Sequence, residues 1–251
     1  MFIQRLANRF GYVIVRLRRW QELARLANYK PSENVLAEHL RRIFHRHRIE
    51  AVLDVGANDG AYALMLRNEA GYEGAIHSFE PIPEKFRQLR ERAKDDNLWE
   101  VYGFALGATS GRLKLNVMKS DVFSSFHLPF ESQPEKYSDS NCVSSVIEVE
   151  VRTVSDEIKR LGLSKVHLKM DTQGFDLEVF EGACPALSKI ATLQSELSFR
   201  QIYKDAPGWK TAVELFSGAG FKLSFLMPIS LEEDLGCIEA DGVFVTVGDQ
   251  V

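Results

Sequence analysis

Four acidic residues of the sequence stand where a carboxylate can hold a nucleoside-type ligand or take a proton from a hydroxyl group. Asp54 lies within a short apolar run, and Glu80 and Asp171 each follow such a run. Glu196 lies within a fourth run. If these runs are neighbouring strands of an open α/β sheet, their carboxyl ends line one crevice. A carboxylate in that crevice can bind a ribose diol or act as a general base.

The first run continues into a turn bounded by glycine. Residues 51–60 read Ala-Val-Leu-Asp-Val-Gly-Ala-Asn-Asp-Gly, and a helical segment follows at 61–69. Gly56, Ala57 and Gly60 have little or no side chain, so a ligand can come close to the backbone. We expect free N–H groups of this turn to face the ligand, because the turn leads into a helix.

The charge and spacing of the turn restrict the ligand class. Asp54 and Asp59 disfavour a phosphate and favour a cationic or hydroxyl-bearing group. The spacing of Gly56 and Gly60 differs from the GxGxxG of dinucleotide sites, and the turn lacks the Gly-Lys-Ser/Thr ending of a phosphate-binding loop. Glu80, about twenty residues beyond the turn, suits a ribose diol. These residues predict a nucleoside-type cofactor.

The elements that position these residues alternate along the chain. We predict strands at 51–55, 75–79, 99–106, 165–170 and 192–199, and helices at 61–69, 83–94, 155–161, 175–187 and 210–217. This order implies right-handed crossovers, a largely parallel sheet and ligands at the carboxyl ends of the strands. Two further strands, at 221–227 and 242–247, can form an antiparallel pair.

The alternation is interrupted at residues 107–152. Residues 111–117 and 143–151 are expected to be antiparallel strands, joined by a Ser-, Pro- and Asp-rich loop at 120–141. A loop this long in a compact domain is usually functional or disordered. We interpret it as a substrate lid or insertion, with a disordered linker as the alternative.

The chain divides into a basic helical extension, residues 1–48, and an α/β domain, residues 49–251. The extension holds eleven Lys and Arg residues against three Asp and Glu, whereas acidic residues are in excess in the domain. Apolar residues recur every three or four positions over 2–28, and a second helix is expected at 33–47. We expect this extension to pack on the domain or on a partner subunit of a homo-oligomer. A peripheral membrane contact is the main alternative, and no nucleic-acid partner is expected.

Cysteine usage and hydropathy bear on the compartment. Cys142, Cys184 and Cys237 are far apart and form no CxxC pair, so a disulfide framework or a zinc site is not expected. No apolar run reaches the length that a membrane-spanning helix needs. We therefore expect a cytoplasmic protein, with membrane association through the extension as the alternative.

The motifs resemble those of the FkbM family of S-adenosylmethionine-dependent methyltransferases over roughly residues 50–247. The segment that carries the resemblance most specifically is Leu168-Lys169-Met170-Asp171-Thr172-Gln173-Gly174-Phe175-Asp176, followed by Glu181-Gly182-Ala183. The other matching segments are residues 53–60, Ser78-Phe79-Glu80-Pro81, Ala105-Leu106-Gly107, 151–156 and 195–199.

This resemblance implies a class I methyltransferase fold, a Rossmann-like α/β domain with helices on both faces of its sheet. The sheet has seven strands and is mostly parallel, with an antiparallel last strand. The resemblance also implies S-adenosylmethionine as methyl donor and a hydroxyl group of a glycan or small metabolite as acceptor. The residues expected to bind the cofactor are Asp54, Gly56, Ala57, Asn58, Gly60, Glu80, Pro81, Ala105 and Asp171.

Transfer to a hydroxyl group needs a general base beside the acceptor. Asp171 is the first candidate, with Lys169 beside it, and Glu196 on the neighbouring strand is the second. His127 in the insertion is a third. Asp171 and Glu196 could instead share a divalent metal ion, although no metal is expected.

Two other functions stay open at the level of sequence. One is methyl transfer to an amine acceptor, including RNA, although the chain lacks the Asn/Asp-Pro-Pro-Tyr-like segment of enzymes that methylate exocyclic amines. The other is a non-catalytic module that binds a partner through residues 1–48.

Overall fold

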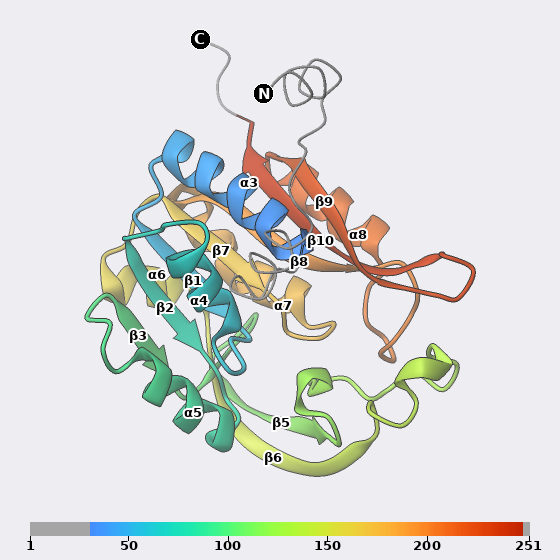
Figure 1. Ribbon diagram of the computed structural model, residues 1–251. Helices are drawn as coiled ribbons and strands as arrows, with labels where there is room; N and C mark the ends of the chain where they lie inside the picture. The colour runs from blue at the N-terminus through green and yellow to red at the C-terminus, as the bar shows by residue number, and fades with distance from the viewer. Residues whose placement is uncertain (1–30, 248–251) are drawn as a thin grey trace, which may run out of the picture. The chain divides into compact units, whose positions relative to one another are not determined.

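The central element of the computed structural model, which describes residues 31–247, is a seven-stranded sheet (Figure 1). Its strand order is β3-β2-β1-β7-β8-β10-β9. These strands are β1 (Ala51–Val55), β2 (Ala75–Phe79), β3 (Trp99–Tyr102), β7 (Val166–Met170), β8 (Ile190–Ser198), β9 (Phe221–Leu231) and β10 (Cys237–Thr246). The last strand, β10, is antiparallel to both of its neighbours, whereas the strands from β3 to β8 pair in parallel. The predicted fold class is confirmed.

Helices cover both faces of this sheet, and its central strands β1 and β7 are buried along their whole length. The face that carries Leu53 and Leu168 packs against α6 (Val154–Leu161), α7 (Asp176–Ala183) and α8 (Trp209–Gly218). The opposite face packs against α3 (Pro31–His47) and α4 (Ala61–Asn68), whose Phe44 and Tyr62 rings lie against His167. The remaining helix, α5 (Pro83–Ala93), begins with Pro83 in its first turn, as predicted, and runs beside β3.

One predicted strand is wrong in its extent. Residues 99–106 do not form one strand, because the chain leaves the main sheet after Tyr102 and resumes as β4 (Ala105–Leu106) in a second sheet. Phe104 turns inward against Phe79, and Ala105 pairs with Val151. Similarly, the helix predicted at 175–187 ends at Ala183, and a 3-10 helix, η3 (Cys184–Lys189), follows because Pro185 cannot continue the hydrogen bonding.

The interruption at 107–152 carries a small sheet of its own. Strands β5 (Gly111–Met118) and β6 (Val143–Arg152) are antiparallel, as predicted, and β4 completes the order β4-β6-β5. Between them lie two 3-10 helices, η1 (Asp121–Phe123) and η2 (Glu135–Tyr137). This segment is hydrogen-bonded to the α/β domain, for example from Phe130 N to Ile202 O at 2.8 Å. It is therefore an ordered insertion, which supports the first of the two interpretations.

The amphipathic stripe predicted over 2–28 and its membrane or subunit contact lie outside the described residues. The described part of the extension is α3, which begins two residues earlier than predicted. From Ala37 onward this helix belongs to the same compact unit as the α/β domain, with Leu40 and Phe44 buried. Within residues 31–247, no helix is both long enough and apolar enough to cross a bilayer.

Candidate functional site

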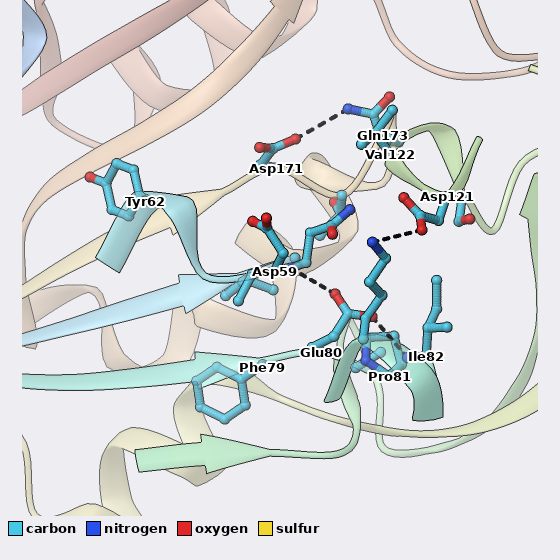
Figure 2. Close-up of a pocket in the computed structure, with 18 of the residues that line it drawn as sticks. Asp59, Tyr62, Phe79, Glu80, Pro81, Ile82, Asp121, Val122, Asp171 and Gln173 are labelled. Atoms are coloured by element: carbon cyan, nitrogen blue, oxygen red, sulfur yellow. Dashed lines mark hydrogen bonds and ion pairs between the residues drawn. The ribbon is translucent and has the colours of Figure 1, made fainter. Parts of the chain in front are cut away.

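A pocket of about 390 Å³ lies at the carboxyl ends of β1, β2, β7 and β8, and residues of the insertion complete its lining. Its volume is in the range of small-molecule sites. Figure 2 shows Glu80 and Pro81 on one side of it and Asp171 and Gln173 on the other. The predicted site residues that line it are Gly56, Ala57, Asn58, Glu80, Pro81, Ala105, Lys169, Asp171 and Glu196. Asp54 and Gly60 lie behind this lining.

The side chain of Glu80 forms one end of the pocket. It is 4% exposed, and its two oxygens accept backbone N–H groups from Asn58 and Ile82, each at 2.8 Å. Each carboxylate oxygen keeps a further acceptor position, because it has two lone pairs. Burial raises the pKa of Glu80 to about 7, although both backbone hydrogen bonds act against this rise. A ligand with two adjacent hydroxyl groups can donate to this carboxylate when it is ionised.

The expectation of free N–H groups in the Gly-bounded turn is wrong for Gly56, Ala57, Asn58 and Gly60. The N–H groups of Gly56 and Ala57 both donate to Phe79 O at 3.1 Å, and that of Asn58 donates to Glu80. Gly60 N donates to Ala57 O. The turn therefore contributes shape and a fixed Glu80 to the pocket, because its donors are already used within the protein.

The two glycines of the turn are required by protein neighbours. Gly56 has φ of +75°, and a Cβ atom there would lie 2.0 Å from the carbonyl oxygen of Asp171. A Cβ atom on Gly60, which has φ of +86°, would lie 2.6 Å from Leu89 and 3.0 Å from Trp99. Gly56 thus lets the turn after β1 touch the backbone that follows β7.

Lys169 joins the two halves of the pocket through ion pairs. Its Nζ lies 3.0 Å from Asp54 Oδ1 and 3.3 Å from Asp171 Oδ2, and it donates to Gly56 O at 3.1 Å. Burial alone would lower the pKa of Lys169, but the Asp54 and Asp171 carboxylates raise it overall. Ser78 Oγ holds the other oxygen of Asp54 at 3.1 Å. Lys169 is therefore a buried cation that fixes Asp171 relative to the turn.

Gln173 organises the other end of the pocket. Its amide nitrogen donates to Asp171 Oδ1 at 3.1 Å and to Glu196 Oε2 at 3.0 Å. Its amide oxygen accepts from the hydroxyl of Tyr203 at 2.7 Å. These partners fix which end of the amide carries the N–H groups, because both carboxylates can accept and the tyrosine can donate. The structure thus brings together the two predicted bases, and an amide bridges them.

The loop after β7 takes its conformation from Asp176, the first residue of α7. Oδ1 of this buried carboxylate accepts from the N–H and the hydroxyl of Thr172, at 2.8 and 2.6 Å. Oδ2 accepts from the hydroxyl of Ser195 at 2.8 Å and from Glu196 N at 3.2 Å. Within this loop Gln173 has φ of +56°, a strained value for a residue with a side chain. Asp176 therefore holds a conformation that aims Gln173 at the carboxylates.

The insertion contributes part of the pocket lining, including Asp121, Val122 and Phe126. Asp121 at the start of η1 forms an ion pair of 2.7 Å with Lys85 of α5, which Figure 2 shows as a dashed line. Phe126 lines the pocket, and the centroid of its ring lies 4.5 Å from that of the Phe175 ring. His127, the third predicted base, does not line the pocket, and its Nε2 lies 3.8 Å from Glu178.

Asp171 and Glu196 both accept from the Gln173 amide, so a metal ion shared by these two carboxylates would have to displace that bridge. Among residues 31–247, no group of three or more His, Cys, Asp or Glu side chains is placed to hold a metal ion.

Sequence reasoning did not assign roles to several residues of this site. Gln173 and Asp176 lie in the most specific motif, so their spacing from Asp171 was the available signal. Tyr203, Lys85 and Asp121 gave no signal, because each depends on a partner that is distant in the chain.

Two sequence comparisons with known proteins give matches. The profile of the Methyltransferase FkbM domain family matches residues 54–223. The 2-O-methyltransferase NoeI of Sinorhizobium fredii is 26% identical over 193 residues, which are 73% of this chain and 77% of that protein.

Two solved structures are similar to the chain at lower identity. Methyltransferase FkbM from Methylobacillus flagellatus is 16% identical, with a TM-score of 0.48, over 78% of this chain and 43% of that chain. Aeropyrum pernix fibrillarin, solved with bound S-adenosyl-L-methionine, is 14% identical, with a TM-score of 0.42, over 78% of this chain and 66% of that chain.

Proposed function

The chain belongs to the FkbM methyltransferase family, and on that premise we propose that it methylates a hydroxyl group of a glycan or small metabolite. The observation that carries this proposal is a single pocket with two chemically different ends. One end offers the buried Glu80 carboxylate, and the other offers Asp171 beside Gln173 and Glu196. The name of the relative NoeI, a 2-O-methyltransferase, supports an oxygen acceptor.

The Glu80 end fits the nucleoside part of S-adenosylmethionine. Its free acceptor positions suit a ribose diol, and Pro81, Ile82 and Ala105 add apolar surface for a base. S-adenosylmethionine supplies a methyl group on a cationic sulfonium, and the carboxylates of Asp59 and Asp171 favour a cation. Glu80 and this acidic lining are the features by which the residues present fit the donor.

Asp171 is the residue that we assign as general base. Methyl transfer to an alcohol depends mostly on the alignment of donor and acceptor, and the hydroxyl proton must also be removed. Lys169 and Gln173 each hold one oxygen of Asp171, so its position is fixed. Burial raises the pKa of Glu196 well above its ordinary range, which favours the protonated form of Glu196, and a protonated carboxyl group cannot take up the hydroxyl proton.

The charge of the acceptor end favours a neutral acceptor. Asp171 and Glu196 line the pocket, and the buried Asp241 carboxyl stands nearby, with its pKa raised to about 7 mainly by burial. The cations that line the pocket, Lys169 and Lys85, are both engaged with carboxylates. A phosphorylated acceptor would bring further negative charge to an end whose two lining cations are already paired, whereas a neutral polyol would not.

The donor site is tested by calorimetry with S-adenosylmethionine. We expect the intact protein to bind it and the Glu80→Ala variant to lose most of this binding, because the diol loses both acceptors. Glu91→Ala, which changes an exposed glutamate on α5, should bind like the wild type. The proposal would be abandoned if the intact protein did not bind S-adenosylmethionine.

The acceptor is tested with S-adenosylmethionine that carries a tritiated methyl group. Glycolipid extracts, polysaccharide extracts, neutral sugars, sugar phosphates and amines would be compared as acceptors. The expected result is transfer to neutral hydroxylated acceptors, with a rate that falls in Asp171→Asn by much more than the affinity for the donor does. Label that enters only amines or RNA would contradict a hydroxyl acceptor.

A further inference from the structure

A second carboxyl group lies behind Glu196 and outside the pocket lining. Glu239 on β10 is 5% exposed, and its buried Oε1 has no hydrogen-bond partner among the described donors. Its Oε2 accepts from the hydroxyl of Tyr137, a residue of η2, at 3.0 Å. Glu196 on β8 is its diagonal neighbour across the sheet, because Glu239 is opposite Ser198 and Asp241 is opposite Glu196, so a side-chain hydrogen bond can join the two carboxyl groups. Two ionised carboxylates have only acceptors, so this bond requires a proton.

The surroundings indicate which of the two acids carries the proton. Tyr137 donates to Glu239 and stabilises its ionised form, as Lys136 does at longer range. Glu196 receives only the Gln173 amide on its Oε2. Each acid thus has one side-chain donor, and the charge of Lys136 favours the ionised form of Glu239, so we place the proton on Glu196.

The charged groups around the pair act in the same direction. Burial raises the pKa of both acids, and the Glu239 carboxylate raises that of Glu196 further. Asp171, Asp176 and Asp241 also raise the pKa of Glu196. The other titratable groups that feel this charge are Tyr137, Tyr203 and Cys237, whose pKa values are raised chiefly by burial.

We infer that Glu196 and Glu239 form an acid–carboxylate pair that shares one proton and connects the insertion to the acceptor end of the pocket. The connection runs from Tyr137 in the insertion to Glu239, then to Glu196, and through the Gln173 amide to Asp171. Glu239 and Tyr137 are thus positioning residues, because neither lines the pocket. The description of Asp171 as the base rests on the proposed function, but the shared proton does not.

The insertion is held in place at the start of this connection. Tyr137 also bonds to Ser230 on β9, and Lys136 Nζ donates to Leu231 O at 2.7 Å. Since η2 is fastened to β9, the position of Tyr137 is set by the α/β domain as well as by the insertion. A shift of η2 would remove the Tyr137 donor from Glu239. The distribution of the shared proton between Glu196 and Glu239 would then change.

The pair is tested by titration, with no acceptor present. Full-length protein labelled with 13C at the glutamate carboxyl would be followed by NMR across pH, and Glu196→Gln would identify the Glu196 signal. In Glu239→Gln the like charge is gone, so the midpoint of Glu196 should fall by about one pH unit or more. Circular dichroism and S-adenosylmethionine affinity would show that each variant is folded.

A second variant keeps the test informative if Glu239→Gln does not fold. Tyr137→Phe removes only the hydroxyl that stabilises the Glu239 carboxylate, so the proton-binding midpoint of the pair should rise. A Glu196 midpoint that is the same in wild type and in the folded variants would overturn the inference. Because no methyl transfer is measured, this result is independent of whether the proposed acceptor is correct.

The positioning role has its own readout. With an acceptor from the tritium screen, Tyr137→Phe should shift the pH dependence of kcat while leaving the donor affinity unchanged. A fall in activity with an unaltered pH profile would indicate a merely structural tyrosine and would contradict the role.

Discussion

Gln173 is a neutral side chain between two acids. Because it is uncharged and carries two N–H groups, it can bridge Asp171 and Glu196 without adding negative charge. Its N–H groups satisfy Asp171 and Glu196 at once, so neither needs a proton from the other. Gln173→Glu, nearly equal in size, would place a third carboxyl group between them. We expect at least about a tenfold loss of kcat and an acidic limb of the pH profile moved to higher pH, because like charges raise the pKa of a base.

The control for this change is Gln88→Glu, which alters an exposed glutamine on α5 in the same way. Methyl transfer measured from pH 5 to 9 for both variants separates the effect of position from that of net charge. An unchanged pH profile in Gln173→Glu would contradict the bridging role.

Glu80 predicts a pH dependence of donor binding. Burial raises its folded-state pKa to about 7, and only the ionised form accepts both hydrogen bonds of a diol. Affinity for S-adenosylmethionine should therefore be full above pH 7 and fall as the pH drops through 7, by about tenfold per pH unit below it. Calorimetry at several pH values checks this, and in Glu80→Gln the weaker binding should vary little over the same range.

The positions of Glu80 and Asp171 in the pocket lining could be inferred from the sequence, because each acid follows a recognisable apolar strand, and their roles stay predictions. The sequence could not predict that Gln173 bridges the two acids. This arrangement depends on a left-handed backbone at Gln173 and on Tyr203, thirty positions away. The sequence also gave no indication that Glu239 lies beside Glu196. Glu239 stands in an apolar stretch, Cys237-Ile238-Glu239-Ala240, where a charge gives no sign of a buried partner.

At the scale of elements, the loop between β7 and α7 depends on Asp176. Asp176→Ala would leave the Thr172 and Glu196 N–H groups and the Ser195 hydroxyl without their acceptor. We expect the free energy of unfolding to fall by about 2–4 kcal/mol, the cost of several buried donors left unpaired. Urea denaturation measures it, with Asp95→Ala, an exposed aspartate, as the control. A loss equal to that of the control would contradict this role.

Gly56 and Gly71 form a matched pair that separates strain from collision. Both have positive φ, +75° and +66°, but a Cβ on Gly71 would meet nothing within 4 Å, whereas on Gly56 it would meet Asp171 O at 2.0 Å. Gly71→Ala should cost about 1 kcal/mol of unfolding free energy and leave donor binding intact. Gly56→Ala should cost clearly more and weaken donor binding, because the two loops must separate. Equal losses in denaturation would show that the close approach is unimportant.

Elements were predicted more successfully than their boundaries. Strand and helix alternation is encoded locally, so β1, β2 and β7 were found to within a residue. The break between β3 and β4 was not predicted, because residues 99–106 are mostly apolar on both sides of it. Residues 105–106 join the second sheet through their pairing with Val151 and Arg152. Contacts distant in the chain decide such boundaries, and one sequence does not display them.

For the whole molecule, the basic extension has two parts that truncation can distinguish. Removing residues 1–30 should leave donor affinity unchanged and abolish any binding to anionic vesicles, which cosedimentation would measure. Removing residues 1–48 also removes Leu40 and Phe44, so the free energy of unfolding should fall by about 3–5 kcal/mol or more. Vesicle binding that survives the shorter truncation would contradict a membrane role for residues 1–30.

The second sheet has a consequence for how such a protein can diversify. The insertion leaves the domain at Ala105-Leu106 and returns at Val151-Arg152, and these two stretches pair side by side, with Gly107 N bonded to Arg152 O at 2.9 Å. Entry and exit therefore lie side by side, and a foreign segment placed between them would also have to keep the contacts of this insertion with Lys85, Ile202 and Glu239. We expect a chimera that takes residues 108–150 from a relative to combine the acceptor preference of that relative with the donor site of this chain.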